Sequence, residues 1–312
     1  MAEAPRTTEP PQPAEPLTVL VTGATGTTGS RVAARLAALG HTVRAASRRG
    51  GTGHGAVAPA APVSRVRFDW YDPDTHADAL RGADRAYLVP PVAEPEPVAV
   101  MGPFLERARA AGVTRVALLS SSAIEAGGPG VGQVHQLLTD SGLFEEWSVL
   151  RPSWFMQNFT GDHLHADSIR RDGVLTTATG TGRVGFVDAD DIAAVAARAL
   201  TDPLPPGPDL VVTGPEALSY ADVAAVVGRV TGRAVRHRAV PPDALAARLT
   251  GGGMPAAFAE LLAALDDGIG RGAEDRVTDT VERVTGVRPR SFARMYREAY
   301  ASSRSTATAP SR

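Results

Sequence analysis

Short apolar runs rich in β-branched residues alternate with segments of helical periodicity along most of this chain. Residues 17–22 have the pattern of a strand buried on both faces, and residues 41–47 form a second strand-like run. Between them Val32, Leu36 and Leu39 recur at helical spacing, which predicts an amphipathic helix. The beginning of the chain therefore predicts a strand, a helix and a second strand in succession.

The same alternation continues for about another 170 residues. Further strand-like runs, each followed by polar or proline residues, are found at 65–68, 86–89, 115–119, 148–150 and 209–212. Strands that alternate with helices predict an α/β fold of the Rossmann type, with a doubly wound parallel sheet. Because ligands of such sheets bind outside the carboxyl ends of the strands, we expect the functional residues directly after these runs.

The pattern divides the chain into four parts. Residues 17–153 form the predicted Rossmann core, and residues 154–300, where the alternation loosens, form a small substrate-cap region together with returning sheet elements. Residues 1–16 are rich in proline and glutamate, and residues 301–312 are rich in Ser, Thr, Ala and Arg. Neither end has an apolar pattern, so both are predicted to be disordered tails.

Three glycines at a spacing of three follow the first strand. Gly23 permits a tight turn, Gly26 allows the backbone to approach a pyrophosphate, and Gly29 allows the helix to pack closely on the strand. The helix N-terminus then offers free N–H groups to the phosphates. Because the motif lies between a strand and a helix, it predicts a dinucleotide site. The predicted cofactor-binding residues of this turn are Gly23, Thr25, Gly26, Thr27, Thr28 and Gly29.

The end of the second strand predicts which nicotinamide cofactor is bound. An NAD site usually has Asp or Glu at this position to hold the ribose 2′-hydroxyl. This chain has Ser47, Arg48 and Arg49 instead, and a guanidinium group binds a 2′-phosphate by charge-assisted hydrogen bonds. Ser47 and Arg48 therefore predict NADP(H). The alternative is a solvated surface arginine, which suits Arg49 better than Arg48.

Composition excludes several kinds of chemistry. The chain has 312 residues, of which 43% are hydrophobic, and a formal net charge of −2. It contains no cysteine, which excludes disulfides, thiolate nucleophiles and cysteine-bound metals. All 32 basic residues are arginine, as a genome of high GC content would favour. The absence of lysine excludes a Schiff base, a P-loop lysine and a catalytic Tyr-x-x-x-Lys pair.

The distribution of charge and apolar residues limits the partners. Charges of both signs are interspersed, so no nucleic acid is expected, and no apolar stretch is long enough for a membrane span. The beginning of the chain lacks the apolar segment of a signal peptide. Acidic and histidine residues near position 165 match no metal motif, so no metal is expected. We expect a cytoplasmic protein, a monomer or weak homodimer, with a small-molecule substrate.

Three segments together resemble one known family. They are residues 21–29 (VTGATGTTG), 120–122 (SSS) and 150–159 (LRPSWFMQNF). The chain resembles the NmrA-like branch of atypical short-chain dehydrogenases/reductases, and within it the ergot-alkaloid-type reductases, festuclavine synthase and agroclavine dehydrogenase. This resemblance implies NADP(H) across the sheet and a substrate between the sheet and the cap.

The chain departs from this family at two positions that matter for catalysis. Many NmrA-like proteins have a lysine before the helix at residues 134–141 and a glutamate within it, whereas here the lysine is absent and His135 stands near the glutamate position. Reduction of a ketone needs a proton donor, but reduction of an iminium ion gives a neutral amine directly. We therefore expect an NADPH-dependent reductase that acts on a C=N or conjugated bond of a secondary metabolite. The alternatives are a redox-sensing regulator without turnover and a non-redox isomerase or cyclase.

The strand ends and the resemblance together assign the remaining site residues. The proposed catalytic residues are His135 and Ser120, although His135 could instead bond the cofactor ribose or a backbone carbonyl. The other predicted cofactor contacts are Asp69, Trp70, Val89, Pro90, Ser120, Ser121 and His135. The predicted substrate contacts are Pro91, Ser121, Trp154, Phe155, Met156, Gln157 and Phe159. Core packing is the alternative for the four apolar side chains among residues 154–159, and a tie within the loop is the alternative for Gln157.

Overall fold

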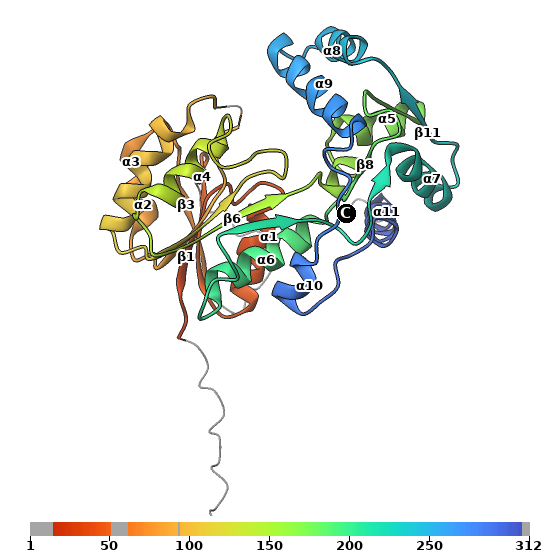
Figure 1. Ribbon diagram of the computed structural model, residues 1–312. Coiled ribbons are helices and arrows are strands. Elements are labelled where there is room, and N and C mark those ends of the chain that lie inside the picture. The colour runs from red at the N-terminus through yellow and green to blue at the C-terminus, as the bar shows by residue number, and fades with distance from the viewer. Residues whose placement is uncertain (1–14, 51–61, 93, 308–312) are drawn as a thin grey trace, which may run out of the picture.

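A seven-stranded parallel sheet forms the centre of the protein (Figure 1). The computed structural model describes residues 15–50, 62–92 and 94–307, and the account below concerns these residues. The strands lie in the order β3-β2-β1-β4-β5-β6-β9, and each pair is parallel. Their bounds are β1 Thr18–Val21, β2 Thr42–Ser47, β3 Val63–Arg67, β4 Arg85–Leu88, β5 Arg115–Leu119, β6 Glu146–Pro152 and β9 Asp209–Val212. The order reverses between β1 and β4, which is where ligands of such sheets bind.

Helices cover both faces of this sheet, which confirms the predicted doubly wound fold. One face carries α1 (Gly29–Ala38), α6 (Ala189–Thr201) and α10 (Thr280–Thr285). The other face carries α2 (His76–Leu80), preceded by the short helix η1 (Pro73–Thr75), then α3 (Pro97–Ala110) and α4 (Val131–Asp140). The two apolar cores between the helices and the sheet consist mainly of Val, Leu and Ala, as expected for strands buried on both sides.

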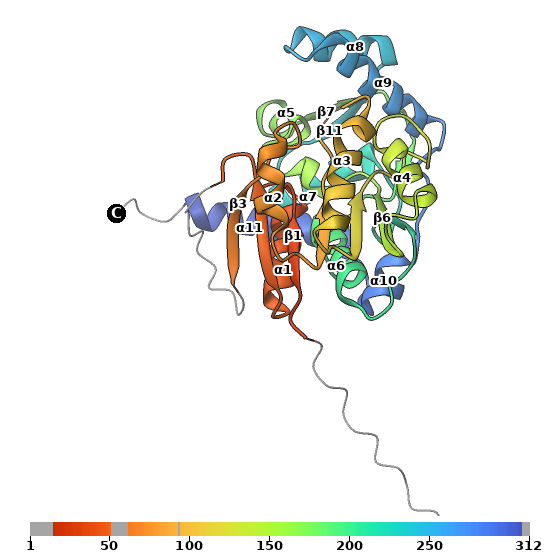
Figure 2. The same ribbon diagram turned by 90° about the vertical axis from the view of Figure 1, so that its left-hand side faces the viewer.

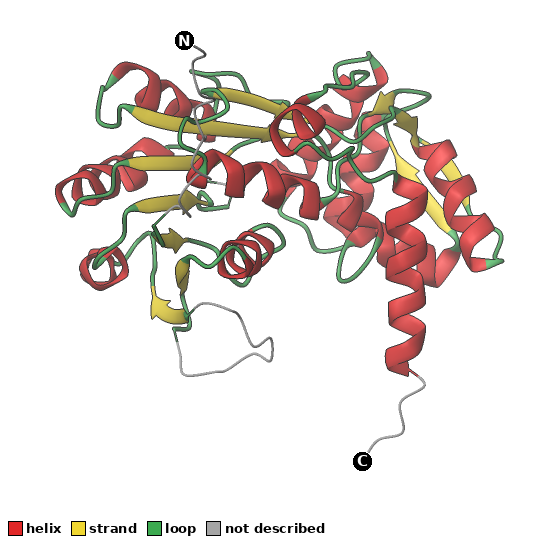
Figure 3. Cartoon of the chain, turned by 90° about the horizontal axis from the view of Figure 1, so that it is seen from below, coloured by secondary structure: helices red, strands yellow, loops and turns green. Residues whose placement is uncertain are grey.

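A second, smaller body lies beside the carboxyl edge of the sheet (Figures 1 and 3). Its elements are η2 Met156–Phe159, α5 Leu164–Asp172, β7 Val174–Thr177, β8 Arg183–Val184, β10 Leu218–Ser219, α7 Tyr220–Thr231, β11 Arg236–Ala239, α8 Pro242–Gly251, α9 Ala256–Gly270 and α11 Phe292–Ala307. β7 pairs with β11 and β8 with β10. Its core is aromatic, with Phe159, Phe186, Tyr220 and Phe292 in edge-on or tilted contact. Such a core is separate from those of the sheet.

Helices α8 and α9 form a hairpin that extends beyond the rest of the cap, at the top of Figure 2. They pack against each other through Leu245 and Ala263, with Ala178 below them. On α9, Phe258 and Leu261 remain exposed although both are large apolar residues. The hairpin therefore has an apolar surface that its own packing does not bury.

The structure corrects some of the predicted boundaries. Helix α11 continues to Ala307, so the prediction of a disordered tail from residue 301 is wrong for its first seven residues. The chain leaves the sheet after β6 and returns to it with α6, β9 and α10. Residues 1–14 and 308–312, which hold most of the two predicted tails, lie outside the described residues.

Candidate functional site

The turn between β1 and α1 has the geometry that its glycines predict. Gly23 has a φ of +59°, and a Cβ on Gly29 would lie 2.3 Å from the carbonyl oxygen of Gly23. No acidic residue is present in the first turn of α1, and the N-cap residue Thr28 makes no side-chain capping bond. Thr25 and Thr27 are exposed at the tip of the turn. The N-terminus of α1 is therefore an uncapped donor site that fits a pyrophosphate group.

Two side chains bond to Val89 after β4, one from the glycine turn and one from the segment after β3. Thr22 Oγ1 accepts a hydrogen bond from the N–H of Val89 at 2.8 Å, and the indole N–H of Trp70 donates to the carbonyl of Val89 at 3.0 Å. A Cβ on Gly23 would lie 3.0 Å from that of Val89. Trp70 also packs edge-on against Phe68, so one of its faces supports the apolar core. Val89 therefore lies between the glycine turn and the position predicted for the adenine ring.

The predicted 2′-phosphate residues lie at the surface. Arg48 and Arg49 follow β2 and are exposed, and Ser47 is half-buried at the end of that strand. Neither arginine forms an ion pair within the described part of the chain. Asp69, which directly precedes Trp70, is half-buried. Its Oδ1 accepts a hydrogen bond from the N–H of Tyr71 at 3.1 Å. The Arg48 and Arg49 guanidinium groups are thus free to bind an anion.

Three serines follow β5, and each has a different environment. The Oγ of Ser120 is buried without a hydrogen-bond partner. The Oγ of Ser121 accepts the N–H of Ala123 at 3.3 Å, which closes a local turn. Ser122 is buried, and its Oγ donates to Oε2 of Glu274 at 2.7 Å. Since buried polar atoms rarely stay unpaired, Ser120 is the one whose hydroxyl is suited to receive a bound group.

Glu274 comes from the segment between α9 and α10 and is only 2% exposed. Its Oε2 also accepts the Oγ of Ser153 at 3.3 Å, and Nη2 of Arg276 lies 3.6 Å from its Oε1. The same nitrogen of Arg276 donates to the carbonyl of Ser122 at 2.7 Å. The carboxylate therefore joins the ends of β5 and β6 to the C-terminal part of the chain.

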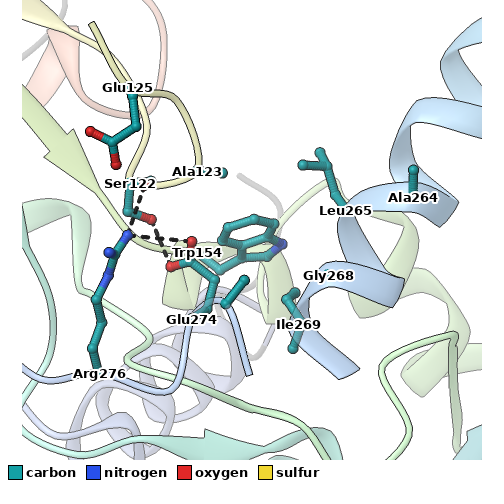
Figure 4. A pocket seen from close by; sticks show the side chains of 11 residues that line it. Ser122, Ala123, Glu125, Trp154, Ala264, Leu265, Gly268, Ile269, Glu274 and Arg276 are labelled. Atoms are coloured by element: carbon teal, nitrogen blue, oxygen red, sulfur yellow. Dashed lines mark hydrogen bonds and ion pairs between the residues drawn. The ribbon is translucent and has the colours of Figure 1, made fainter. Parts of the chain in front are cut away.

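These groups border a cavity of about 260 Å³ between the edge of the sheet and α9 (Figure 4). Trp154 lies in the middle of the lining, with the polar residues on one side and α9 on the other. The polar lining residues are Ser122, Glu125, Glu274 and Arg276. The apolar side is formed by Ala264, Leu265, Ile269 and Ala273, with Gly268 and Ala123. A polar end opposite an apolar wall is typical of a site for a small organic molecule.

Arg151, near the end of β6, is buried and does not line the cavity. It pairs with Glu125 and, at 2.9 Å, with Asp209, and it donates to the carbonyls of Ser121 and Ser122. The hydrogen bond from Arg151 lowers the pKa of the Glu125 carboxyl. Arg151 thus fixes the loop after β5 and offers no free charge to a ligand.

His135 lies on α4 and is 4% exposed, outside the set of residues that line the cavity. Its ring is edge-on to that of Trp147 at 6.1 Å, and its Nδ1 has no hydrogen-bond partner. Burial lowers its pKa, so the ring is neutral at pH 7. This position does not favour the predicted roles of His135 as a proton donor or a cofactor contact.

The structure also separates the predicted substrate residues from one another. Trp154 lines the cavity, whereas Met156 and Phe159 are fully buried in the aromatic core of the cap. Gln157 uses its amide to bond Asp188 at 2.9 Å and the N–H of Ala189 at 2.9 Å. We therefore correct the assignment of Met156 and Phe159 to packing, and that of Gln157 to a tie between η2 and α6. Phe155 packs on the core of the sheet, and Pro91 is half-buried after β4.

Sequence reasoning missed the most buried charge of the cavity. Glu274 stands in a polar stretch of residues 274–276 with no motif around it, and Ser122 was noted only as part of the segment 120–122 that carries the family resemblance. Nothing near it in sequence indicated that Ser122 and Ser153 would be its partners.

Two further findings concern metals and membranes. In the described ranges, no three His, Asp or Glu side chains form a group that could hold a metal ion. Among the helices of the same residues, none is both long and apolar enough to cross a membrane.

Comparison with known sequences places this arrangement among nicotinamide-dependent proteins. Residues 23–203 match the NAD(P)H-binding family. The chain is 46% identical over 263 residues to the uncharacterized oxidoreductase YesF of Bacillus subtilis, covering 84% of this chain and 88% of that protein. It is 40% identical over 241 residues to agroclavine dehydrogenase of Claviceps fusiformis, covering 74% of this chain and 82% of that protein.

Solved structures share the whole architecture at low sequence identity. The NADPH-dependent quinone oxidoreductase QOR2 of Escherichia coli, in complex with NADPH, has a TM-score of 0.73 at 22% identity and covers 91% of this chain and 100% of its own. NmrA, a negative transcriptional regulator, has a TM-score of 0.69 at 18% identity. The match covers 95% of this chain and 99% of NmrA. The sheet, its flanking helices and the cap are therefore common to reductases and to a regulator.

Proposed function

The chain belongs to the NAD(P)H-binding family and is an oxidoreductase. We propose that it is a reductase of the NmrA-like type that uses NADP(H), and that its hydride acceptor is a C=N or conjugated bond in a small organic molecule. The observation that carries this proposal is the cavity at the carboxyl edge of β5 and β6, lined by Trp154 but by no tyrosine. Ligands of doubly wound sheets bind at this edge.

The cofactor would extend along the carboxyl edge from β2 to β5. In this proposal the N–H groups at the start of α1 hold the pyrophosphate, and Arg48 holds the 2′-phosphate with help from Ser47. Asp69 and Trp70 would contact the adenine. Val89 and Pro90 would support the nicotinamide end, and the unpaired Oγ of Ser120 would bond its carboxamide.

The substrate would occupy the cavity lined by Trp154 and Glu274. The ring of Trp154 and the side chains of Leu265 and Ile269 would exclude water from the reacting atoms. Pro91, Ser121 and Phe155 remain predicted neighbours of the site, because they lie at strand ends or next to Trp154 without lining the cavity. The apolar lining from α9, Ala264, Leu265 and Ile269, supports a substrate with an apolar ring system.

The residues around the cavity favour an acceptor that needs no protein proton. The chain has five tyrosines, and none of them lines the cavity. Tyr87, Tyr220 and Tyr296 are buried in cores, and the hydroxyl of Tyr71 bonds Glu94 at 2.7 Å. When bound, NADPH supplies a hydride to the carbon of a C=N⁺ bond, whose π electrons become the nitrogen lone pair. The role of the protein is then to bind and orient the acceptor and to exclude water.

The experiment that tests this proposal follows NADPH oxidation at 340 nm. N-methyl-3,4-dihydroisoquinolinium, menadione and cyclohexenone represent an iminium ion, a quinone and an enone, and NADH is measured alongside. We expect turnover with the iminium ion and NADPH, at a higher kcat/KM than with NADH. Tight NADPH binding without oxidation by any acceptor would contradict the proposal and favour a regulator. Conversion of an acceptor without net NADPH oxidation would favour an isomerase or cyclase.

A further inference from the structure

We infer that Glu274 is the residue that selects a positively charged substrate, by presenting a buried carboxylate to a cation held against the ring of Trp154. This inference rests on the proposed function and names a determinant of its substrate class. Both residues line the same cavity, and Figure 4 shows the carboxylate of Glu274 between Ser122 and the indole of Trp154.

The hydrogen bonds of Glu274 leave part of its carboxylate available. Oε2 accepts the hydroxyl groups of Ser122 at 2.7 Å and Ser153 at 3.3 Å. Oε1 accepts no hydrogen bond from either serine. It lies 3.6 Å from Nη2 of Arg276, which is an ion-pair distance but longer than a good hydrogen bond. Two hydroxyl donors stabilise a buried carboxylate without removing its charge. The negative charge is therefore held in a fixed position at the edge of the cavity.

The charges around the cavity do not cancel. Glu125 and Glu274 are acidic lining residues, and Arg276 is the basic residue that lines the described cavity. Arg276 donates its Nη2 to the carbonyl of Ser122, and its side chain is 37% exposed to solvent. Arg151 does not line the cavity and pairs with both Glu125 and Asp209. These five side chains comprise three carboxylates and two guanidinium groups, so together they keep an excess negative charge.

An organic cation fits both parts of this cavity. A cation over the face of a tryptophan is attracted by the ring quadrupole, and a nearby buried carboxylate adds a directed charge. Leu265 and Ile269 provide the apolar wall that its ring system needs. Because hydride transfer turns the iminium ion into a neutral amine, the attraction of Glu274 is greatest before the reaction. Glu274 should therefore act on KM more than on kcat.

The test measures binding separately from turnover. Full-length protein loaded with 1,4,5,6-tetrahydro-NADP, a reduced cofactor analogue that cannot transfer hydride, is titrated by calorimetry. The probes are the cation N-methylquinolinium and the neutral ring 1-methyl-2-quinolinone. We expect Glu274→Gln to weaken binding of the cation on the order of tenfold or more and to change that of the neutral ring less than about twofold. Equal weakening of both probes, or no change in either, would overturn the inference.

A matched control and a second variant protect this test against a folding artefact. Asp275→Asn removes the same charge one residue further along, from an exposed side chain outside the cavity lining, and should leave both affinities unchanged. Glu274→Asp keeps the charge, so it should recover selectivity for the cation even if both affinities fall. If Glu274→Asp and Glu274→Gln lose cation selectivity equally, the role of Glu274 is structural.

The same measurement separates this inference from the proposed function. If no acceptor oxidises NADPH but the cation still binds selectively through Glu274, the proposed reaction fails and the inference about Glu274 stands. If the iminium ion is reduced and Glu274→Gln changes KM for the iminium ion and for menadione by the same factor, the reaction stands and the inference fails.

Discussion

Gly29 approaches Gly23 so closely that a Cβ on Gly29 would lie 2.3 Å from the carbonyl oxygen of Gly23. This distance is far below any van der Waals contact. The start of α1 can therefore pack this closely against the end of β1 only if residue 29 has no side chain. The close approach aligns the first N–H groups of the helix with the end of the strand. The cofactor cradle therefore depends on a packing contact as much as on turn flexibility.

Gly29→Ala should displace the helix start and weaken NADPH binding strongly, with a loss of roughly 1–3 kcal/mol in the free energy of unfolding from overpacking. Urea denaturation and calorimetric titration with NADPH measure the two effects. Gly251→Ala at the end of α8 is the control, because a Cβ there meets no atom within 4 Å. If Gly29→Ala binds NADPH as tightly as the wild type, the turn does not hold the pyrophosphate.

Arg48→Asp should reverse the cofactor preference. Replacing a guanidinium with a carboxylate removes charge-assisted hydrogen bonds to the 2′-phosphate and adds repulsion, so the Kd for NADPH should rise roughly 10- to 100-fold. The Kd for NADH, which has no 2′-phosphate, should stay the same or fall. Arg49→Asp is the matched control and should have the smaller effect. If both variants raise the Kd for NADPH equally, Arg48 is not the specific binding residue of the 2′-phosphate.

His135→Leu should preserve catalysis. The ring is buried beside Trp147, burial lowers its pKa, and it does not line the cavity. We expect kcat for the iminium ion within about threefold of the wild type, an unchanged pH profile, and a change in the free energy of unfolding below about 1.5 kcal/mol. Ser120→Ala is the comparison, and it should raise the Kd for NADPH. If His135→Leu removes one limb of the pH dependence of kcat, His135 acts as a proton donor and this prediction is wrong.

Asp266→Asn should change how stability depends on pH. Burial raises the pKa of the Asp266 carboxyl from 3.8 to about 6, although the N–H of Ala178 donates to it at 2.8 Å. Because the folded pKa is raised, the native state holds a proton that the unfolded state has lost between about pH 4 and pH 6. This contribution to stability is present at low pH and is lost as pH rises through 6.

The asparagine variant keeps an acceptor for Ala178 without an ionisable group. Its free energy of unfolding relative to the wild type should therefore increase from pH 4 to pH 6 and then become constant. Urea denaturation across this range measures the difference. Asp267→Asn removes the neighbouring carboxylate on α9 and should not reproduce the increase. A difference that does not vary with pH would show that folding does not raise the pKa of Asp266.

The parts of this protein that short-range patterns predicted are those whose physics is local. Apolar periodicity predicted the parallel sheet, with β5 and β9 at their observed bounds and other strands displaced by a few residues. The glycine turn was predicted because tight turns, close backbone approach and a free helix N-terminus depend on neighbouring residues. The end of α11 was missed, because the Ser, Thr, Ala and Arg of residues 301–307 favour neither helix nor coil strongly.

Only the tertiary structure decided which side chains meet. Within residues 154–159 the sequence could not distinguish Trp154, which lines the cavity, from Met156 and Phe159, which are buried in the cap. It also could not bring Glu274 to Ser122, 152 positions earlier in the chain. Periodicity encodes which face of an element is apolar, but the partner of that face comes from the packing of distant segments. The sequence by itself thus determined the fold and the cofactor turn, and the tertiary structure alone placed a buried carboxylate in the cavity.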